Sequence, residues 1–130
     1  MPALKHADLT SDIIAAFYKV YRVFKFRRSY SNFNLAEAMK FELQSRGHQV
    51  EREVRVHRTY ERHRIGSDRV DLVVDELIVI VVKNNAQITS VHYDKLCAYL
   101  EDGGWPVGLL LNFGGKEPEV RRADRPSGSQ

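Results

Sequence analysis

Two charged residues stand where they could take part in metal-assisted hydrolysis of a phosphodiester. Asp71 lies in the stretch Arg69–Val74, and Lys83 ends the apolar stretch Leu77–Lys83 that follows. Aspartate oxygens are suitable ligands for Mg²⁺, and a lysine can orient the attacking water or steady the developing charge. Such a site also needs a second carboxylate. The residue that shares a strand face with Lys83, two positions earlier, is Val81.

The surrounding sequence predicts the elements that would position these residues. Apolar residues at helical spacing predict helices over 11–25, 35–46 and 91–102. Alternating or continuous apolar runs predict strands over 49–60, 70–74, 77–83 and 107–113, with a turn at 64–68 between the first two. The run 77–83 should lie at the sheet centre, and a helical crossover should make it parallel to 107–113. The predicted fold class is α/β with the order ααβββαβ.

Length and composition favour one domain. The 130 residues are 43% hydrophobic and 28% charged, as expected of a globular protein. We expect a domain over 1–115 and a flexible tail over 116–130, with room for one short edge strand in the tail. The longest apolar run is too short to cross a bilayer, and residues 1–12 lack the apolar region of a secretory signal. A cytoplasmic location without membrane contact is therefore expected.

The single cysteine, Cys97, lies among apolar residues at helical spacing. A catalytic cysteine needs a histidine and an orienting group beside it. Nothing in the sequence indicates that arrangement, so Cys97 is expected to be a buried thiol.

The segments resemble a known family when they are taken in order. The chain is similar to the GxxExxY branch of the PD-(D/E)XK nuclease superfamily over the range 10–114. The resemblance implies a restriction-endonuclease-like core, in which a central mixed sheet is flanked by helices. The segments that carry it are Ile13–Ala16, Glu37–Leu43, Arg46–Gly47, Val50–Val54, Arg69–Val74, His92, Tyr99–Leu100 and Val107–Gly114.

The chain departs from the family pattern at the positions that give the branch its name. The resemblance sets the Gly, Glu and Tyr against Ser29, Asn32 and Leu35. With a two-residue insertion, Tyr30 would stand against the Glu instead. Neither alignment supplies a carboxylate.

The metal-binding element is also altered. The resemblance places the Glu of the E-x-K element at Val81, and an expected Gln of the crossover helix at Lys95. Asp71 and Lys83 are what remains of the catalytic set. Because one anionic ligand rarely holds Mg²⁺, no cofactor is expected, and Asp71 and Lys83 are predicted to form a remnant ion pair.

Two alternatives would restore a metal site. Another carboxylate can replace the missing ligand if the fold brings it to Asp71, and a softer metal can use histidines. The favoured rescue joins Asp71 to Glu53. Further candidates are Glu37, Glu42 and Asp94 for Mg²⁺, and His57, His63 and His92 for a softer metal.

Positive charge is concentrated in the first half of the chain. Residues 19–69 hold 13 Lys and Arg against 6 Asp and Glu, whereas the net charge of the whole chain is only +3. A basic surface of this kind can contact phosphates, and it can equally be a solvated surface with acidic partners. The candidate nucleic-acid contacts are Arg22, Lys25, Arg27, Arg28, Arg55, Arg58, Arg62 and Arg64.

Three functions follow from these observations. The first is a catalytically inactive nuclease-like domain that serves as a protein-interaction or scaffold module, with a protein partner or a second copy of itself. The second is a domain that binds DNA or RNA without cutting it. The third is a Mg²⁺-dependent nuclease with a relocated carboxylate. Asn32, Val81 and Lys95 together stand where the family resemblance expects Glu, Glu and Gln. The joint loss of these three polar groups favours the first function.

Overall fold

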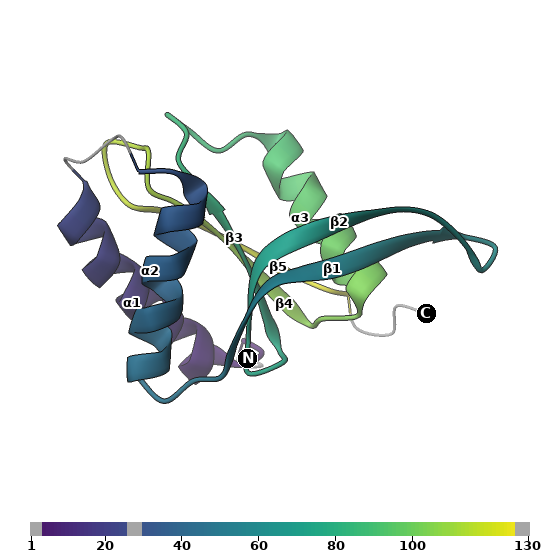
Figure 1. Cartoon of the computed structure of the whole chain (residues 1–130), viewed down its shortest axis with the longest axis horizontal. Helices are drawn as coiled ribbons and strands as arrows, with labels where there is room; N and C mark the ends of the chain where they lie inside the picture. The colour runs from purple at the N-terminus through teal and green to yellow at the C-terminus, as the bar shows by residue number, and fades with distance from the viewer. Residues whose placement is uncertain (1–3, 26–29, 127–130) are drawn as a thin grey trace.

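The helices and strands follow the predicted order, with one strand added at the end. The computed structural model describes residues 4–25 and 30–126. The order is ααβββαββ, so the predicted α/β class is confirmed (Figure 1). The elements are α1 Ala7–Phe24, α2 Asn32–Ser45, β1 Val50–Tyr60, β2 His63–Val74, β3 Ile78–Lys83, α3 Ser90–Gly103, β4 Val107–Asn112 and β5 Glu119–Asp124.

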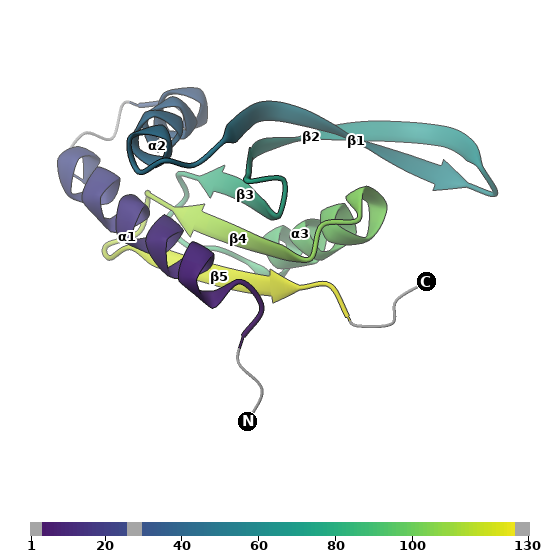
Figure 2. The ribbon, with the colours of Figure 1, turned by 90° about the horizontal axis from the view of Figure 1, so that it is seen from below.

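The strands form one mixed sheet in the order β1-β2-β3-β4-β5. The β3–β4 pair is parallel and is connected through α3, as predicted, while the other three pairs are antiparallel. Helices α1 and α2 cover one face of the sheet and α3 covers the other (Figure 2). All six residues of β4 are buried, and so are the first five of β3. This confirms the prediction that the run 77–83 lies at the sheet centre under helices on both faces.

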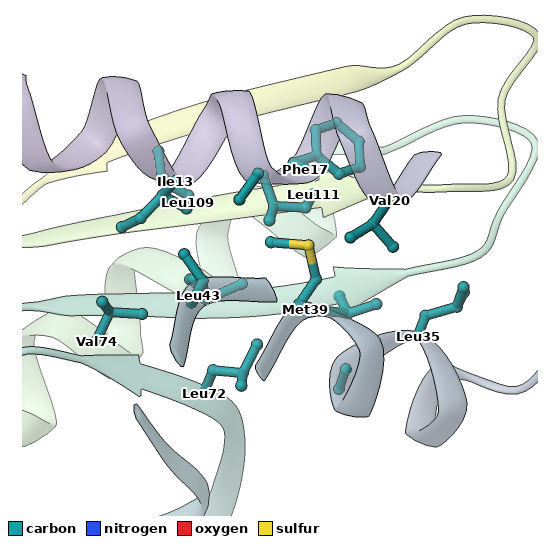
Figure 3. Packing of buried hydrophobic residues seen from close by; sticks show 14 of the residues in the cluster. Ile13, Phe17, Val20, Leu35, Met39, Leu43, Leu72, Val74, Leu109 and Leu111 are labelled. Atoms are coloured by element: carbon teal, nitrogen blue, oxygen red, sulfur yellow. The ribbon is translucent and has the colours of Figure 1, made fainter. Parts of the chain in front are cut away.

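The larger core lies between α1, α2 and the sheet. Ile13 and Phe17 of α1 meet Met39 and Leu43 of α2 above the central strands (Figure 3). The ring of Phe17 contacts that of Phe113 edge to face, with centroids 4.9 Å apart. These side chains are buried or nearly so, because helices that cover a sheet turn a continuous apolar stripe inward.

A smaller core lies under α3. Leu96, Tyr99 and Leu100 pack on Val79 and Leu110 of the central strands. Burial raises the pKa of the Tyr99 hydroxyl, and nearby Asp68 raises it further. Cys97 packs against this cluster, as its apolar neighbours predicted, but it is only partly buried and not the fully buried thiol that the sequence indicated.

The predicted turn at 64–68 is wrong, because those residues belong to β2. The turn lies at Glu61 and Arg62, whose φ angles of 46° and 70° make it a left-handed two-residue hairpin turn. Glycine, asparagine and aspartate are the usual signals of such a turn. Neither residue is one of these, so the turn was not apparent in the sequence.

The hairpin of β1 and β2 bends where Glu53 faces Asp71. Glu53 has a φ of 51°, and the regular pairing of the two strands is interrupted there. Val50 packs against the larger core, whereas Val54 packs against the smaller one. Even-numbered side chains of β1 therefore point to one face of the sheet before the bend and to the other face after it. The part of the hairpin beyond the bend, residues 54–70, is called the outer hairpin, and it continues over α3 (Figure 1).

Two polar groupings hold the connections in place. Fully buried Asn112 accepts from the backbone N–H groups of Asn85 and Gly114 at 3.0 and 3.1 Å and donates to the Asn85 carbonyl at 2.9 Å and Glu119 at 3.1 Å. Gly114 is required beside it. A Cβ at that position would meet backbone atoms of Asn84 and Asn85 at 2.5 Å.

The second grouping connects α1 to the turns before β1 and β3. His48 places its two ring nitrogens 2.6 Å from Asp12 and 2.7 Å from Asp75. The Asp12 and Asp75 carboxylates raise the pKa of His48 against the effect of its burial. Arg46 also pairs with Asp12, at 2.7 Å. The pKa of Asp12 is lowered by its hydrogen bonds to His48 and Arg46.

Two further expectations concern the ends of the chain and the membrane. The flexible tail predicted over 116–130 contains β5, which pairs with β4 from Glu119 to Asp124, so the boundary at 115 is set too early. The sequence signal was weak because an edge strand needs few apolar residues: Ala123 alone of β5 is buried. No helix in the described part of the chain is long and apolar enough to cross a membrane.

Candidate active site

Asp71 lies at the bend of the hairpin, is partly buried, and is close enough to Tyr99 of α3 to raise the pKa of that hydroxyl. Its Oδ2 accepts a hydrogen bond of 2.7 Å from the backbone N–H of Val82 on β3. Burial raises the pKa of the Asp71 carboxyl, while the Val82 N–H, Arg52 and Lys83 act in the opposite direction. The carboxyl is thus anchored to the neighbouring strand, in a place where its charge is unfavourable.

Lys83 ends β3, with its backbone carbonyl accepting from the N–H of Phe113 at 2.8 Å. It shares a strand face with Val81 and approaches Asp71 closely enough to lower the pKa of that carboxyl. Among the described residues, however, no ion pair joins Lys83 to Asp71. The predicted remnant pair is therefore wrong as a contact, because Asp71 bonds to the Val82 backbone instead.

Val81 occupies the position across from Asp71. The register that pairs Leu72 with Ile80 sets Val81 opposite Asp71 at the next step. Val81 is 8% exposed and belongs to the apolar cluster under α3 that includes Tyr99. A carboxylate at this position would lie on the same face as Asp71 and Lys83. The valine contributes packing there and no ligand atom.

Arg52 places a guanidinium among the remaining carboxylates. Its Nε donates to Glu37 Oε2 at 2.6 Å, its Nη1 donates to the Asp71 main-chain carbonyl at 2.5 Å, and its Nη2 lies 3.9 Å from Glu53 Oε1. The guanidinium also lies over the ring of Phe33, 5.2 Å from its centroid. Hydrogen bonds from Arg52 and Lys40 lower the pKa of Glu37. A fixed cation therefore stands beside Asp71, where the sequence indicated only one basic residue among many.

The proposed rescue ligands do not converge on Asp71. Glu53 lies close enough to raise the Asp71 pKa, but it is held by Arg52 and, at 3.7 Å, by Arg69. Glu42 is paired with Lys19 and Arg46, and Asp94 is exposed on α3. His57 and His63 lie on the outer hairpin, and His92 accepts from the Thr89 N–H at the start of α3. The described residues contain no group of three His, Cys, Asp or Glu that could hold a metal ion.

The positions that the family resemblance aligned with Gly-Glu-Tyr contribute no catalytic group in the described chain. Asn32 opens α2 and is exposed, and Leu35 is buried in the larger core. Tyr30 packs on Phe24 with ring centroids 4.8 Å apart, and its carbonyl accepts from Asn84 at 2.9 Å. Ser29 lies outside the described residues. On α3, Lys95 is exposed.

The predicted basic surface is divided in two. Arg22 and Lys25 lie at the end of α1, whereas Arg55, Arg58, Arg62 and Arg64 lie on the outer hairpin at the opposite end of the molecule (Figures 1 and 2). Arg27 and Arg28 lie outside the described residues. A single nucleic-acid surface made of all these residues is therefore not formed.

A family model decides the relationship that the order of elements suggested. The model of the PD-(D/E)XK nuclease superfamily matches residues 7–123, from the start of α1 to the end of β5. The chain belongs to the PD-(D/E)XK nuclease superfamily. Among curated proteins and among solved structures, nothing matches it. Membership of the GxxExxY branch stays a prediction.

A PD-(D/E)XK nuclease uses a divalent metal, and the donors of this PD-(D/E)XK domain do not fit one. Mg²⁺ requires near-octahedral oxygen ligands, with at least one or two carboxylates free to face it. Here Asp71 bonds to backbone and Val81 supplies no oxygen, while Arg52 engages Glu37 and the Asp71 carbonyl. A fixed positive charge beside the site also disfavours a second cation.

Proposed function

We propose that this PD-(D/E)XK domain is catalytically inactive and acts as a binding module. The observation that carries the proposal is the position of Arg52, which donates to Glu37 and to the Asp71 carbonyl and approaches Glu53. An internal guanidinium supplies there the charge compensation that a metal supplies in an active nuclease. With Val81 buried opposite Asp71, the position that the family resemblance assigns to the E-x-K glutamate supplies no oxygen ligand, and the nearby Glu53 carboxylate faces Arg52 and Arg69.

The test measures metal binding and cleavage together. Mg²⁺ and Mn²⁺ are titrated into the purified chain by calorimetry, and plasmid DNA, single-stranded DNA and RNA are incubated with the same metals. The expected result is no binding heat at millimolar metal and no cleavage. Saturable metal binding together with cleavage that Asp71→Ala abolishes would overturn the proposal. Cleavage that Asp71→Ala leaves unchanged would indicate a contaminating nuclease, so Asp71→Ala is the matched control.

A protein-interaction role, including self-association, is favoured by one further feature. A groove of about 400 Å³ runs between α1 and α2 and is lined in part by Val23 and Phe41, which are 54% and 62% exposed. Large apolar side chains exposed side by side are typical of protein contacts. Sedimentation velocity over a wide concentration range tests self-association, with Phe41→Glu as the disrupting variant and Val91→Glu, on exposed α3 surface, as the control. A monomer at every concentration would remove the homodimer.

A further inference from the structure

The outer hairpin extends beyond what the fold requires. β3 pairs with β2 only at Leu72–Val74, so the hairpin outside the bend has no third strand. Val56 and Val70 pack on the α3 side, but every residue from 59 to 67 is exposed. Both views show this end projecting past α3 (Figures 1 and 2). We call residues 59–67 the arm tip. Since no residue of the arm tip is buried, packing within the domain does not explain its presence.

The chemistry of the arm tip is basic and aromatic. Among the described residues, Arg62 and Arg64 form no ion pair, and Glu61 is the one acidic residue of the tip. Tyr60 and Ile65 are 63% and 67% exposed. Arginine beside an exposed aromatic ring is a combination that interfaces favour.

The base of the arm tip is fixed by contacts across the hairpin. Arg58 forms a short ion pair with Asp68 and lies 3.9 Å from Asp102 of α3. Arg55 donates to the Ser67 hydroxyl at 2.9 Å. These two arginines therefore hold the hairpin in place, which leaves Arg62 and Arg64 to project from a positioned ribbon.

The shape of the arm tip selects one nucleic acid. Two paired strands lie about 4.8 Å apart, and the tight turn at Glu61–Arg62 keeps the end narrow. A two-stranded ribbon of this kind fits the major groove of B-form DNA, which is about 12 Å wide and about 8.5 Å deep. Two to three residue pairs of about 3.3 Å each span that depth. The major groove of duplex RNA is too narrow for such a ribbon.

We propose that the arm tip enters the major groove of duplex DNA, with Arg62 and Arg64 contacting phosphates or guanine edges and Tyr60 packing against the groove wall. The pairing shifts between Arg58 and Thr59, which leaves Ile65 as an extra residue, and such a bulge increases the twist of the ribbon. A twisted ribbon follows the turn of the groove. The inference rests on the proposed role as a binding module and adds duplex DNA as a ligand of that module, at a surface separate from the groove between α1 and α2.

The test compares two pairs of arginines by fluorescence anisotropy with a labelled 20-base-pair DNA, using the full chain at 50 and 200 mM salt. Arg62→Gln with Arg64→Gln is expected to weaken binding on the order of 10–100-fold and to reduce the salt slope by about 2. The matched control, Arg22→Gln with Arg121→Gln, removes the same charge from exposed positions elsewhere and should change binding less than threefold. Both double variants should keep the wild-type melting temperature, because none of the four side chains is buried.

Each contrary outcome has a distinct meaning. Equal weakening by the two double variants would reveal general charge attraction and overturn the arm tip as the site. Equal affinity for duplex RNA of the same sequence would overturn entry into the major groove. Absence of DNA binding at 50 mM salt would overturn the inference as a whole. Cleavage of the labelled DNA with Mg²⁺ would instead overturn the proposed inactivity, and it is read from the same samples on a gel.

Discussion

Replacing Val81 by glutamate tests whether this position is the one from which a metal ligand is missing. V81E gives up about 1.5–3 kcal/mol of apolar burial, since the valine is only 8% exposed. A new carboxylate beside Asp71 lowers the free energy of unfolding by a further amount of about 3–5 kcal/mol, because an uncompensated buried charge is unfavourable. The Asp71 pKa is already raised by burial, which indicates that this environment disfavours negative charge. The sum is comparable to the whole stability of a typical domain.

A metal should recover part of that loss. With Asp71 and a second carboxylate on one face, Mn²⁺ at a hundred times its dissociation constant would stabilise V81E by about 2.7 kcal/mol. For a domain of this size that corresponds to a rise in melting temperature of roughly 10 °C. The assay is thermal unfolding followed by circular dichroism, with and without Mn²⁺. V81Q is the control, because it has nearly the same shape and no charge, and its melting temperature should not respond to Mn²⁺.

The role given to Arg52 enters the same experiment. Because its guanidinium lies beside Asp71, V81E should respond to Mn²⁺ more strongly when combined with R52Q. V81E and the V81E/R52Q double variant could each melt at the same temperature with and without Mn²⁺. In that case, adding one carboxylate at position 81 does not create a metal site. The interpretation of Val81 as the position of the missing ligand would then be wrong.

Three further predictions concern the groups that hold the site's surroundings. Asn112→Ala should lower the free energy of unfolding by about 2–4 kcal/mol, because four hydrogen bonds of a fully buried amide are lost; urea denaturation measures this, and exposed Asn32→Ala should have little effect. Gly114→Ala should lower the free energy of unfolding by about 1–3 kcal/mol, because the new Cβ overlaps backbone atoms of Asn84 and Asn85. Gly66→Ala, with open space around its Cβ, is the control and should have little effect. Equal effects of the two substitutions would contradict the close approach at Gly114. His48→Gln should destabilise most below pH 6.5, because a raised pKa stabilises the fold below the unfolded value and this contribution fades as pH rises through the folded pKa. Melting temperatures from pH 5 to 9 test the last prediction, and a loss that grows with pH would refute it.

The sequence determined the central part of this protein because the signals there are local. A short, almost wholly apolar run rich in β-branched residues favours a buried strand over a helix, and this signal placed β3 correctly. Local sequence also predicts the two N-terminal helices, because the apolar stripes of α1 and α2 follow from residues three or four apart. The end of α2 is predicted in the same way by Gly47, which has a φ of 92°. Asp71 and Lys83 were placed on adjacent strands for the same reason.

Tertiary structure decided what depends on distant partners. The bend at Glu53 puts a non-glycine residue in the left-handed region, a conformation that costs about 1–3 kcal/mol and that local propensity would not predict. That bend turns Arg52 toward Glu37 and the Asp71 carbonyl, so a residue that looked like part of a basic surface became an internal counter-charge. β5 exists as a strand because β4 offers it an edge, and the basic residues separate because α1 and the hairpin lie at opposite ends of the molecule. Spacing along the chain specifies which residues share an element. Which charges come together is set by long-range strand pairing, whose bends and edges carry only a weak trace in the local sequence.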